Sequence, residues 1–164
     1  MLRKLLTLFS VVRGEVFIGH SELSMRVLRH DGKVEDLGVV CRKKVTVAFV
    51  NDLVDELQAH SGIENYKYHD YGTGTTGEDN TDTAMETACG EARTVGSQTE
   101  GASANIYKTV ATHTFAGTFA ITEHGIFNAS SAGTLMDRSV FAAINVVAND
   151  KIESTYQLTI NAEA

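Results

Sequence analysis

The C-terminal segment of this chain alternates regularly between apolar and polar positions. Over residues 151–160, one face of an extended chain carries the apolar side chains Ile152, Tyr156, Leu158 and Ile160, and polar side chains occupy the opposite face. Because successive side chains of a strand point to opposite faces of a sheet, this period of two predicts a β-strand with one buried and one solvated face.

Shorter runs of the same kind recur along the chain and are separated by turn residues. We expect further strands over residues 15–18, 25–28, 37–40, 66–71, 106–115, 119–127, 134–140 and 144–147. Asp31 and Gly32 form a tight-turn signal, which predicts a hairpin between the second and third of these strands. Gly117, Gly125 and Gly133 recur every eight residues, as the turns of a meander do. The sequence therefore predicts a mainly β protein, an antiparallel, jelly-roll-like β-sandwich.

One segment, residues 46–60, has a helical period instead. Its apolar side chains recur at i, i+3, i+4 and i+7 spacing, at Phe49, Val50, Leu53, Val54 and Leu57. Thr46 can cap the start of a helix, and Ser61 with Gly62 can end it. We therefore expect a helix that lies on the sheet and buries this apolar stripe.

The chain divides at residue 44 into a basic and an acidic part. Residues 1–44 are expected to form an N-terminal hairpin and arm region, and residues 45–164 the sandwich with its helix, together as one unit. The first twelve residues have a basic start and a short apolar run, but Arg13 and Glu15 follow at once. We expect an arm that packs on a partner, because a signal peptide or membrane span needs a longer apolar run.

The bulk composition narrows the function classes. The 164 residues are 43% hydrophobic and 21% charged, with a net charge of −7, which disfavours nucleic acid as a main partner. Cys41 and Cys89 stand alone, without the clustered ligands of a zinc site. We expect both to be reduced and buried, although a single disulfide remains an alternative.

Two short segments in the middle of the chain partly match the sequence patterns of known ligand-binding loops. Residues 72–77 match the glycine spacing of a dinucleotide fingerprint, but a polar run precedes them and carboxylates follow, which disfavours phosphate. Residues 78–86 contain four carboxylates at Glu78, Asp79, Asp82 and Glu86, without the ordered spacing of a calcium loop. A flexible surface loop with an exposed acidic turn is the expectation for both.

The histidines and charged pairs give no catalytic set. Glu123 and His124 are neighbours on a strand and should point to opposite faces, while His69 and His113 have no visible nucleophile partner. We predict no catalytic, cofactor-binding or metal-binding residues. Instead, amphipathic tyrosines and charged pairs are predicted to form contacts between protein surfaces. The candidates are Arg26, Arg29, Tyr66, Tyr68, Tyr71, Tyr107, Asp137 and Arg138.

Several segments between about residues 37 and 160 resemble small virion proteins of tailed bacteriophages. They are residues 68–76 (YHDYGTGTT), 82–84 (DTA), 93–98 (RTVGSQ), 103–107 (SANIY), 121–127 (ITEHGIF), 133–141 (GTLMDRSVF), 144–146 (INV) and 150–152 (DKI). The resemblance implies a structural role, with a capsid decoration (cement) protein as the leading hypothesis. It also implies a homo-oligomer, commonly a trimer, that binds the major capsid protein and brings no cofactor.

Three alternatives remain open at this point. The chain can instead be a tail, baseplate or fibre component, or a host-surface module that binds glycans through its tyrosines and polar loops. An enzyme that binds a nucleotide at the glycine string is the last of these hypotheses. The first 36 residues match nothing in the family and are expected to be specific to this protein.

Overall fold

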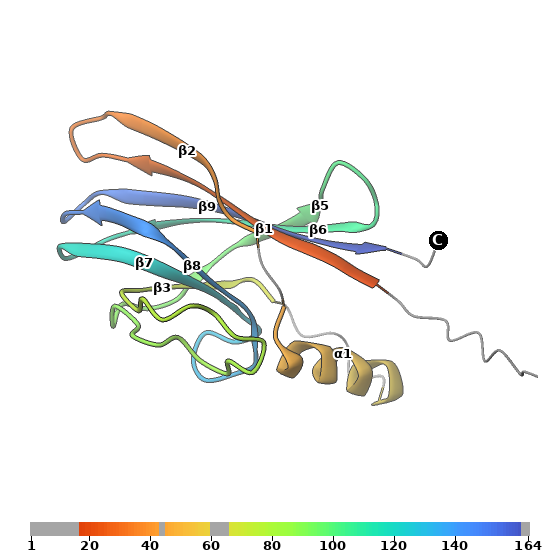
Figure 1. Cartoon of the computed structure of the whole chain (residues 1–164). Helices are drawn as coiled ribbons and strands as arrows, with labels where there is room; N and C mark the ends of the chain where they lie inside the picture. Colours follow the sequence, from red (N-terminus) through yellow and green to blue (C-terminus); the bar gives the residue numbers. More distant parts are fainter. Residues whose placement is uncertain (1–16, 43–44, 60–65, 162–164) are drawn as a thin grey trace, which may run out of the picture.

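Two antiparallel β-sheets face each other in this protein, and one helix lies beside the smaller sheet (Figure 1). The computed structural model describes residues 17–42, 45–59 and 66–161, so the expected arm over residues 1–12 lies outside these ranges. Within them, all strands pair in the antiparallel sense. The predicted antiparallel β-sandwich is confirmed, and its jelly-roll connectivity stays a prediction.

The larger sheet has five strands in the spatial order β2-β1-β9-β6-β5. They are β2 (Val34–Cys41), β1 (Phe17–Leu28), β9 (Lys151–Asn161), β6 (Ile106–Thr114) and β5 (Ser97–Glu100). β1 pairs with β9 along its whole length, from Phe17 to Leu28. The N-terminal hairpin therefore belongs to the same sheet as the C-terminal strand.

The smaller sheet has four strands in the order β4-β3-β7-β8. They are β4 (Thr94–Val95), β3 (Tyr68–Gly72), β7 (Phe119–Phe127) and β8 (Leu135–Val146). We expected two strands where β8 runs as one, and that expectation is wrong. Ile121 faces Ile144 and Glu123 faces Val140, so three residues of β8 stand opposite one residue of β7. The apparent gap in the pattern is an irregularity of the bulge type inside a continuous strand.

Gly96 lets the chain pass from β4 in the smaller sheet to β5 in the larger one. Its N–H donates to the carbonyl of Lys67 at 2.7 Å. A Cβ atom at this position would lie 2.7 Å from Nε2 of His69 and closer still to Oγ1 of Thr109. Glycine is therefore required where the backbone crosses between the two layers.

The hydrophobic core fills the space between the sheets. The most deeply buried aliphatic side chains, at most 1% exposed, are Leu23, Met25, Val27, Ile121, Ile126, Leu135, Val146, Ile152 and Leu158. On the last strand, the predicted inward face is confirmed for Ile152, Tyr156 and Leu158, while Ile160 is only half-buried at the end of the sheet. Alternation thus determines which face of each strand meets the core.

The predicted turn between β1 and β2 is also confirmed. Gly32 has a φ of 89°, which favours glycine. The N–H of Arg29 donates to the carbonyl of Lys33 at 2.8 Å, and Lys33 donates its own N–H to the Asp31 carboxylate at 3.1 Å. Cys41 and Cys89 are free thiols, Cys41 buried and Cys89 half-buried.

The helix α1 (Val47–Ala59) begins where the sequence predicts. The hydroxyl of Thr46 accepts the N–H of Phe49 at 3.1 Å, which is the predicted cap. The ring of Phe49 is buried against Tyr66, with ring centroids 5.0 Å apart. The cap and this aromatic pair fix the start of the helix on the sandwich.

The expected burial of the whole apolar stripe is wrong. Leu53 is half-buried against the core, but Val50 and Val54 are 37% and 47% exposed. The reason is placement, because α1 contacts β8 at the side of the sandwich and does not lie across a sheet face. The side chain of Leu57 is outside the described residues.

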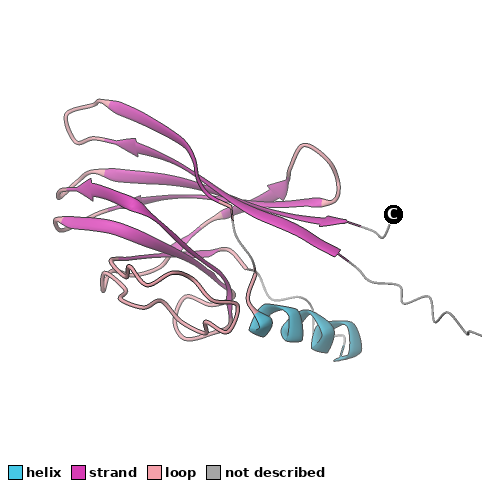
Figure 2. Ribbon diagram, in the orientation of Figure 1, coloured by secondary structure: helices cyan, strands magenta, loops and turns pink. Residues whose placement is uncertain are grey.

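Residues 73–93 form a long loop, here called the covering loop, which lies against the outer face of the smaller sheet (Figure 2). Arg93 lies over the ring of Phe127, with its guanidinium carbon 3.4 Å from the ring centroid. Met85 lies over Gly125, where a Cβ atom would come within 2.6 Å of the Met85 sulfur. Gly125 was expected at a turn, but it lies within β7 and makes room for the covering loop.

Candidate functional site

Glu123 is a fully buried carboxylate on β7, beneath the covering loop. Its Oε1 accepts backbone N–H groups from Thr87 at 2.7 Å and Gly74 at 3.1 Å. Its Oε2 accepts the N–H of Glu86 at 3.1 Å and Nε–H of Arg138 at 2.7 Å. Four donors therefore compensate a charge whose burial would otherwise be strongly unfavourable.

Arg138 on β8 extends this arrangement and is itself nearly inaccessible, at 3% exposed. Its guanidinium donates to the carboxylates of Asp82 and Glu86, each at 3.1 Å, and to the carbonyl of Thr76 at 3.2 Å. Burial alone would lower the pKa of Arg138, but hydrogen bonds to Glu123 and Asp82 outweigh it, and the pKa is raised. We call Glu123, Arg138, Asp82 and Glu86 the carboxylate–arginine network.

This network explains the glycine string and the acidic turn. Gly74 is buried, and a Cβ atom there would lie 2.7 Å from Oε1 of Glu123, so glycine allows the backbone N–H to reach the carboxylate. The expected exposed loop is therefore wrong for Gly72 and Gly74, which are both buried. Two N–H groups of the glycine string already donate to carboxylates of the chain, Gly74 to Glu123 at 3.1 Å and Thr76 to Glu86 at 2.8 Å. Among the described residues, no three His, Cys, Asp or Glu side chains are grouped to hold a metal ion.

Three predicted interface residues are buried, Arg138 beneath the covering loop and two in the core between the sheets. Asp137 accepts hydroxyl hydrogen bonds from Ser21 at 2.7 Å and Ser139 at 2.8 Å. The hydroxyl of Tyr71, whose side chain is 1% exposed, bonds to Ser154 at 3.0 Å. A contact with another chain is therefore wrong for Asp137, Arg138 and Tyr71, because their polar groups bond within the chain.

The other predicted interface residues lie nearer the surface, with one exception. Tyr66 is only 3% exposed, and its hydroxyl donates to Asp52 on α1. The Tyr107 hydroxyl donates to the Tyr66 carbonyl at 2.5 Å, with its ring half-buried, and Tyr68 is half-buried too. Arg26 is exposed, and its role at an interface stays a prediction.

Arg29 has a structural function at the end of the β1–β2 hairpin. It forms a two-bond pair with Glu35 at 2.8 and 2.9 Å and donates to Asp150 at 3.0 Å. Asp150 also accepts the backbone N–H of His30 at 2.8 Å. Burial would raise the pKa of Asp150, but hydrogen bonds from His30 and Arg29 outweigh it and hold that pKa well below its usual range. The guanidinium thus joins the hairpin to the β8–β9 turn.

Two histidines face each other between the sheets. Nδ1 of His69 lies 3.0 Å from Nε2 of His124, and Nε2 of His69 lies 3.1 Å from the Thr109 hydroxyl. Nδ1 of His124 is buried without a hydrogen-bond partner among the described residues. Burial lowers the pKa of His69 to about 3, and burial together with His69 lowers that of His124 well below its usual value. Both rings are therefore neutral near pH 7.

A third histidine joins a carboxylate to a hydroxyl. Nε2 of His113 lies 2.6 Å from the Glu91 carboxylate, and its Nδ1 lies 2.6 Å from the Thr94 hydroxyl. The second oxygen of Glu91 accepts the N–H of Ala116 at 2.9 Å. This arrangement could not be recognised in the sequence, because Glu91 and Thr94 lie about twenty residues before His113. No local spacing in the sequence marks it.

This order of groups resembles a nucleophile–base–orienter set in outline. The imidazole of His113 is 6% exposed and packs against Tyr71 and Phe115, with ring centroids 4.9 and 4.5 Å away. Glu91 and Thr94 are half-buried. The same bonds tie the covering loop to β6, so they serve the fold in any case.

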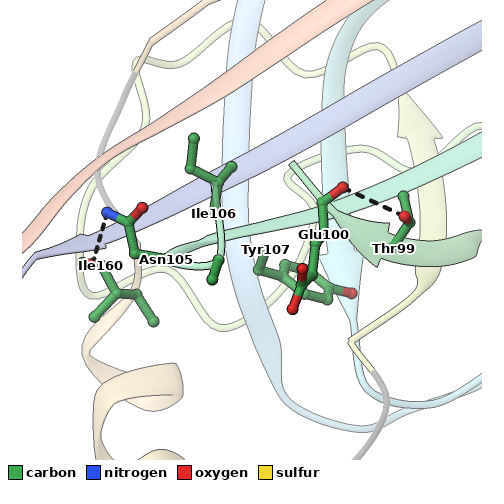
Figure 3. Close-up of a pocket in the computed structure, with 7 residues that line it drawn as sticks. Thr99, Glu100, Asn105, Ile106, Tyr107 and Ile160 are labelled. Atoms are coloured by element: carbon green, nitrogen blue, oxygen red, sulfur yellow. Dashed lines mark hydrogen bonds between the residues drawn. The ribbon is translucent and has the colours of Figure 1, made fainter. Parts of the chain in front are cut away.

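A surface hollow of about 440 Å³ opens at the end of the larger sheet (Figure 3). It is lined by Thr99, Glu100, Ala104, Asn105, Ile106, Tyr107 and Ile160. Asn105 donates its side-chain N–H to the carbonyl of Ile160 at 3.2 Å, which holds the β5–β6 loop against β9. Its volume lies in the range of small-molecule and side-chain pockets.

Comparisons with known proteins identify no relative, because no protein-family model, no curated protein and no solved structure matches the chain. Among the described residues, no helix is long and apolar enough to span a bilayer. The function must therefore be argued from the residues and their geometry.

Proposed function

We propose that this chain is a structural protein of a tailed-bacteriophage virion, a capsid decoration (cement) protein. In this role it binds the major capsid protein and stabilises the head. The motifs of this chain resemble those of small virion proteins, and the place that they occupy in the fold supports the proposed role.

The motif residues build and fasten the scaffold. Residues 121–127 form most of β7, and residues 133–141 include the first half of β8. These two segments contribute Glu123 and Arg138, two of the buried charges that hold the covering loop on the smaller sheet. The motifs that resemble virion proteins thus include residues that hold the fold together, as a structural role requires.

The described surface offers several small apolar contacts. Its exposed large apolar side chains are Val34, Leu37, Val39, Val47, Val50, Val54, Val95 and Val147. Six of the eight lie on β2 and α1. Scattered contacts of this size are weak one at a time, but a symmetric shell repeats each contact many times. The net charge of −7 also disfavours binding to packaged DNA.

The proposal includes a homo-oligomer, with a trimer favoured, on the outer surface of the capsid. Assembly takes place in the host cytoplasm, and neither nucleic acid nor membrane is a proposed partner. Light scattering should then give a mass of three 17.7-kDa chains. A mass of one chain at micromolar concentration would contradict the trimer without contradicting the capsid role.

Adding the purified chain to heads that lack it tests the capsid role. The protein should co-sediment with the heads at a fixed copy number and raise the temperature at which they release DNA. Heads that gain neither protein nor heat resistance would refute the proposal. Labelled chain found only at the tail of intact particles would support the alternative of a tail, baseplate or fibre component. Binding to host cells without heads would support a host-surface module.

A hydrolytic function is the second candidate, because Thr94, His113 and Glu91 are bonded in the order of a nucleophilic site. The test is the release of nitrophenol from p-nitrophenyl acetate by the purified chain and by the variant Thr94→Val. Release that disappears in the variant would favour an enzyme over a structural protein. Equal release from both would leave the hydroxyl with a structural role.

A further inference from the structure

The hollow of Figure 3 lies beside an open edge of the larger sheet. β5 is the last strand of that sheet, and its four residues are all exposed. Only β6 pairs with it among the described strands. The other side of its backbone is therefore available to an extended segment, which can bind by adding a strand.

The walls of the hollow are apolar and preformed. Ile106 and Ile160 are half-buried there, and the ring of Tyr107 is fixed by its hydrogen bond to the Tyr66 carbonyl. The loop that closes the hollow is held by the N–H of Gly101, which donates to the Ile106 carbonyl at 2.8 Å. A side chain that enters this space needs little rearrangement of the chain, which favours binding.

Glu100, at the hollow, differs in its ion pairing from the other glutamates on the strands of the larger sheet. The strands of the larger sheet carry four glutamates, and three of them, Glu22, Glu35 and Glu153, pair with Arg42, Arg29 and Arg26. The fourth, Glu100, takes part in none of the ion pairs found among the described residues, and it is exposed at the hollow. The hollow therefore combines apolar walls with an uncompensated negative charge.

We propose that this hollow receives a lysine or arginine side chain from an extended segment of a partner protein, which adds to the edge of β5. The methylene stem of the incoming side chain packs on Ile106 and Ile160, and its charged end reaches Glu100. A partner segment with basic residues also complements the net charge of −7. This binding mode depends only on the hollow and the β5 edge, whether or not the partner is a capsid protein.

A peptide titration followed by backbone-amide NMR of the full chain tests the proposal. The probe is the blocked peptide acetyl-Thr-Val-Lys-Val-Thr-amide, and its matched control has norleucine in place of lysine. Shifts are expected at the amides of β5 and of residues 104–107, with weaker binding of the control peptide. Because an exposed ion pair contributes little, the difference should be about two- to fivefold.

Two variants separate charge recognition from a general charge effect. Glu100→Gln should weaken binding of the lysine peptide to the level of the norleucine peptide. Asp55→Asn removes one exposed negative charge on α1 and should leave binding unchanged. Equal binding of both peptides, or shifts centred on β2, would overturn the proposal. Concentration-dependent shifts at β5 without peptide would also overturn it, because a second copy would then be the occupant.

Discussion

Acidification from pH 7 to pH 5 should destabilise this protein through its buried histidine pair. His69 and His124 are each at most 1% exposed, and burial holds the pKa of both below the usual range. In the unfolded chain, both rings take up protons with a pKa of about 6.5. The unfolded state therefore binds more protons than the native state as the pH falls, which lowers the free energy of unfolding.

The magnitude follows from proton linkage. A group with a depressed folded pKa contributes stability that is present above its unfolded pKa and lost as the pH falls. For His69 the window runs from about pH 6.5 down to about pH 3, its folded pKa. Between pH 7 and pH 5, His69 therefore contributes a loss of about 2 kcal/mol. His124 adds to this loss, because burial and His69 also depress its pKa in the folded chain.

Asp137 acts in the opposite direction over the same range. Burial raises its pKa to about 6, although hydroxyl groups of Ser21 and Ser139 hydrogen-bond to it. A raised carboxyl pKa favours folding below the unfolded value, and that contribution is lost as the pH rises through 6. Between pH 7 and pH 5 the native state gains about 1 kcal/mol from this group. The net loss from His69 and Asp137 is therefore about 1 kcal/mol, and His124 increases it.

Urea unfolding followed by circular dichroism at pH 7 and pH 5 measures this difference. The variant Asp137→Asn keeps a hydrogen-bonding side chain but removes the opposing titration, so its loss should exceed that of the wild-type chain by about 1 kcal/mol. Carboxylates with lowered pKa values contribute little above pH 5, because even their unfolded forms are mostly ionised there. Stability that stays constant or rises towards pH 5 in the variant would refute the reasoning. So would ring signals of His69 or His124 that titrate near pH 6.5.

Three substitutions test the packing by urea unfolding at pH 7, and two of them have a matched exposed control. Glu123→Ala leaves a buried guanidinium and three backbone N–H groups without their carboxylate and should cost about 3–5 kcal/mol of stability. The control Glu100→Gln, at the exposed β5 edge, should cost under about 0.5 kcal/mol. Equal costs would show that the covering loop does not bury Glu123. Leu53→Asp should cost about 1–3 kcal/mol of stability because the side chain packs on the core. The control Val54→Asp, at the next and exposed position, should cost under about 0.5 kcal/mol. A larger cost for Val54→Asp than for Leu53→Asp would mean that α1 is rotated about its axis. Gly96→Ala should cost about 1–3 kcal/mol because its Cβ atom meets side chains of both sheets, and a neutral result would contradict the tight crossing there.

The elements with a clear period were predictable from the sequence, and so was the type of fold. Alternation over residues 151–160 predicts β9 because its polar and apolar sides face solvent and core in turn. Thr46 and the helical spacing after it predict α1, since a cap and a repeat act through neighbouring residues. These signals are local, so no knowledge of distant contacts was needed to use them.

The contents of the site were not predictable in the same way. Glu123 and His124 were expected to point to opposite faces, and they do, one under the covering loop and the other into the core. However, the partners of Glu123 come from residues 74, 86, 87 and 138, which only the folded chain brings together. The exposed valines of α1 were missed for the same reason, because a helical stripe does not show how wide its partner surface is.

The covering loop shows why charge replaces apolar packing at one face of this sandwich. Its residues are mostly threonine, glycine, alanine and carboxylates, which offer little apolar area to offset the entropy of ordering a long loop. Glu123 and Arg138 make up for this, because each of these buried charges has all its partners only when the loop is in place. The loop supplies the N–H groups of residues 74, 86 and 87 to Glu123 and the carboxylates of Asp82 and Glu86 to Arg138. A buried network of this kind is unfavourable when half formed, so the loop must dock as a whole or not at all. That cooperativity gives a polar surface one defined shape, which the proposed structural role would require.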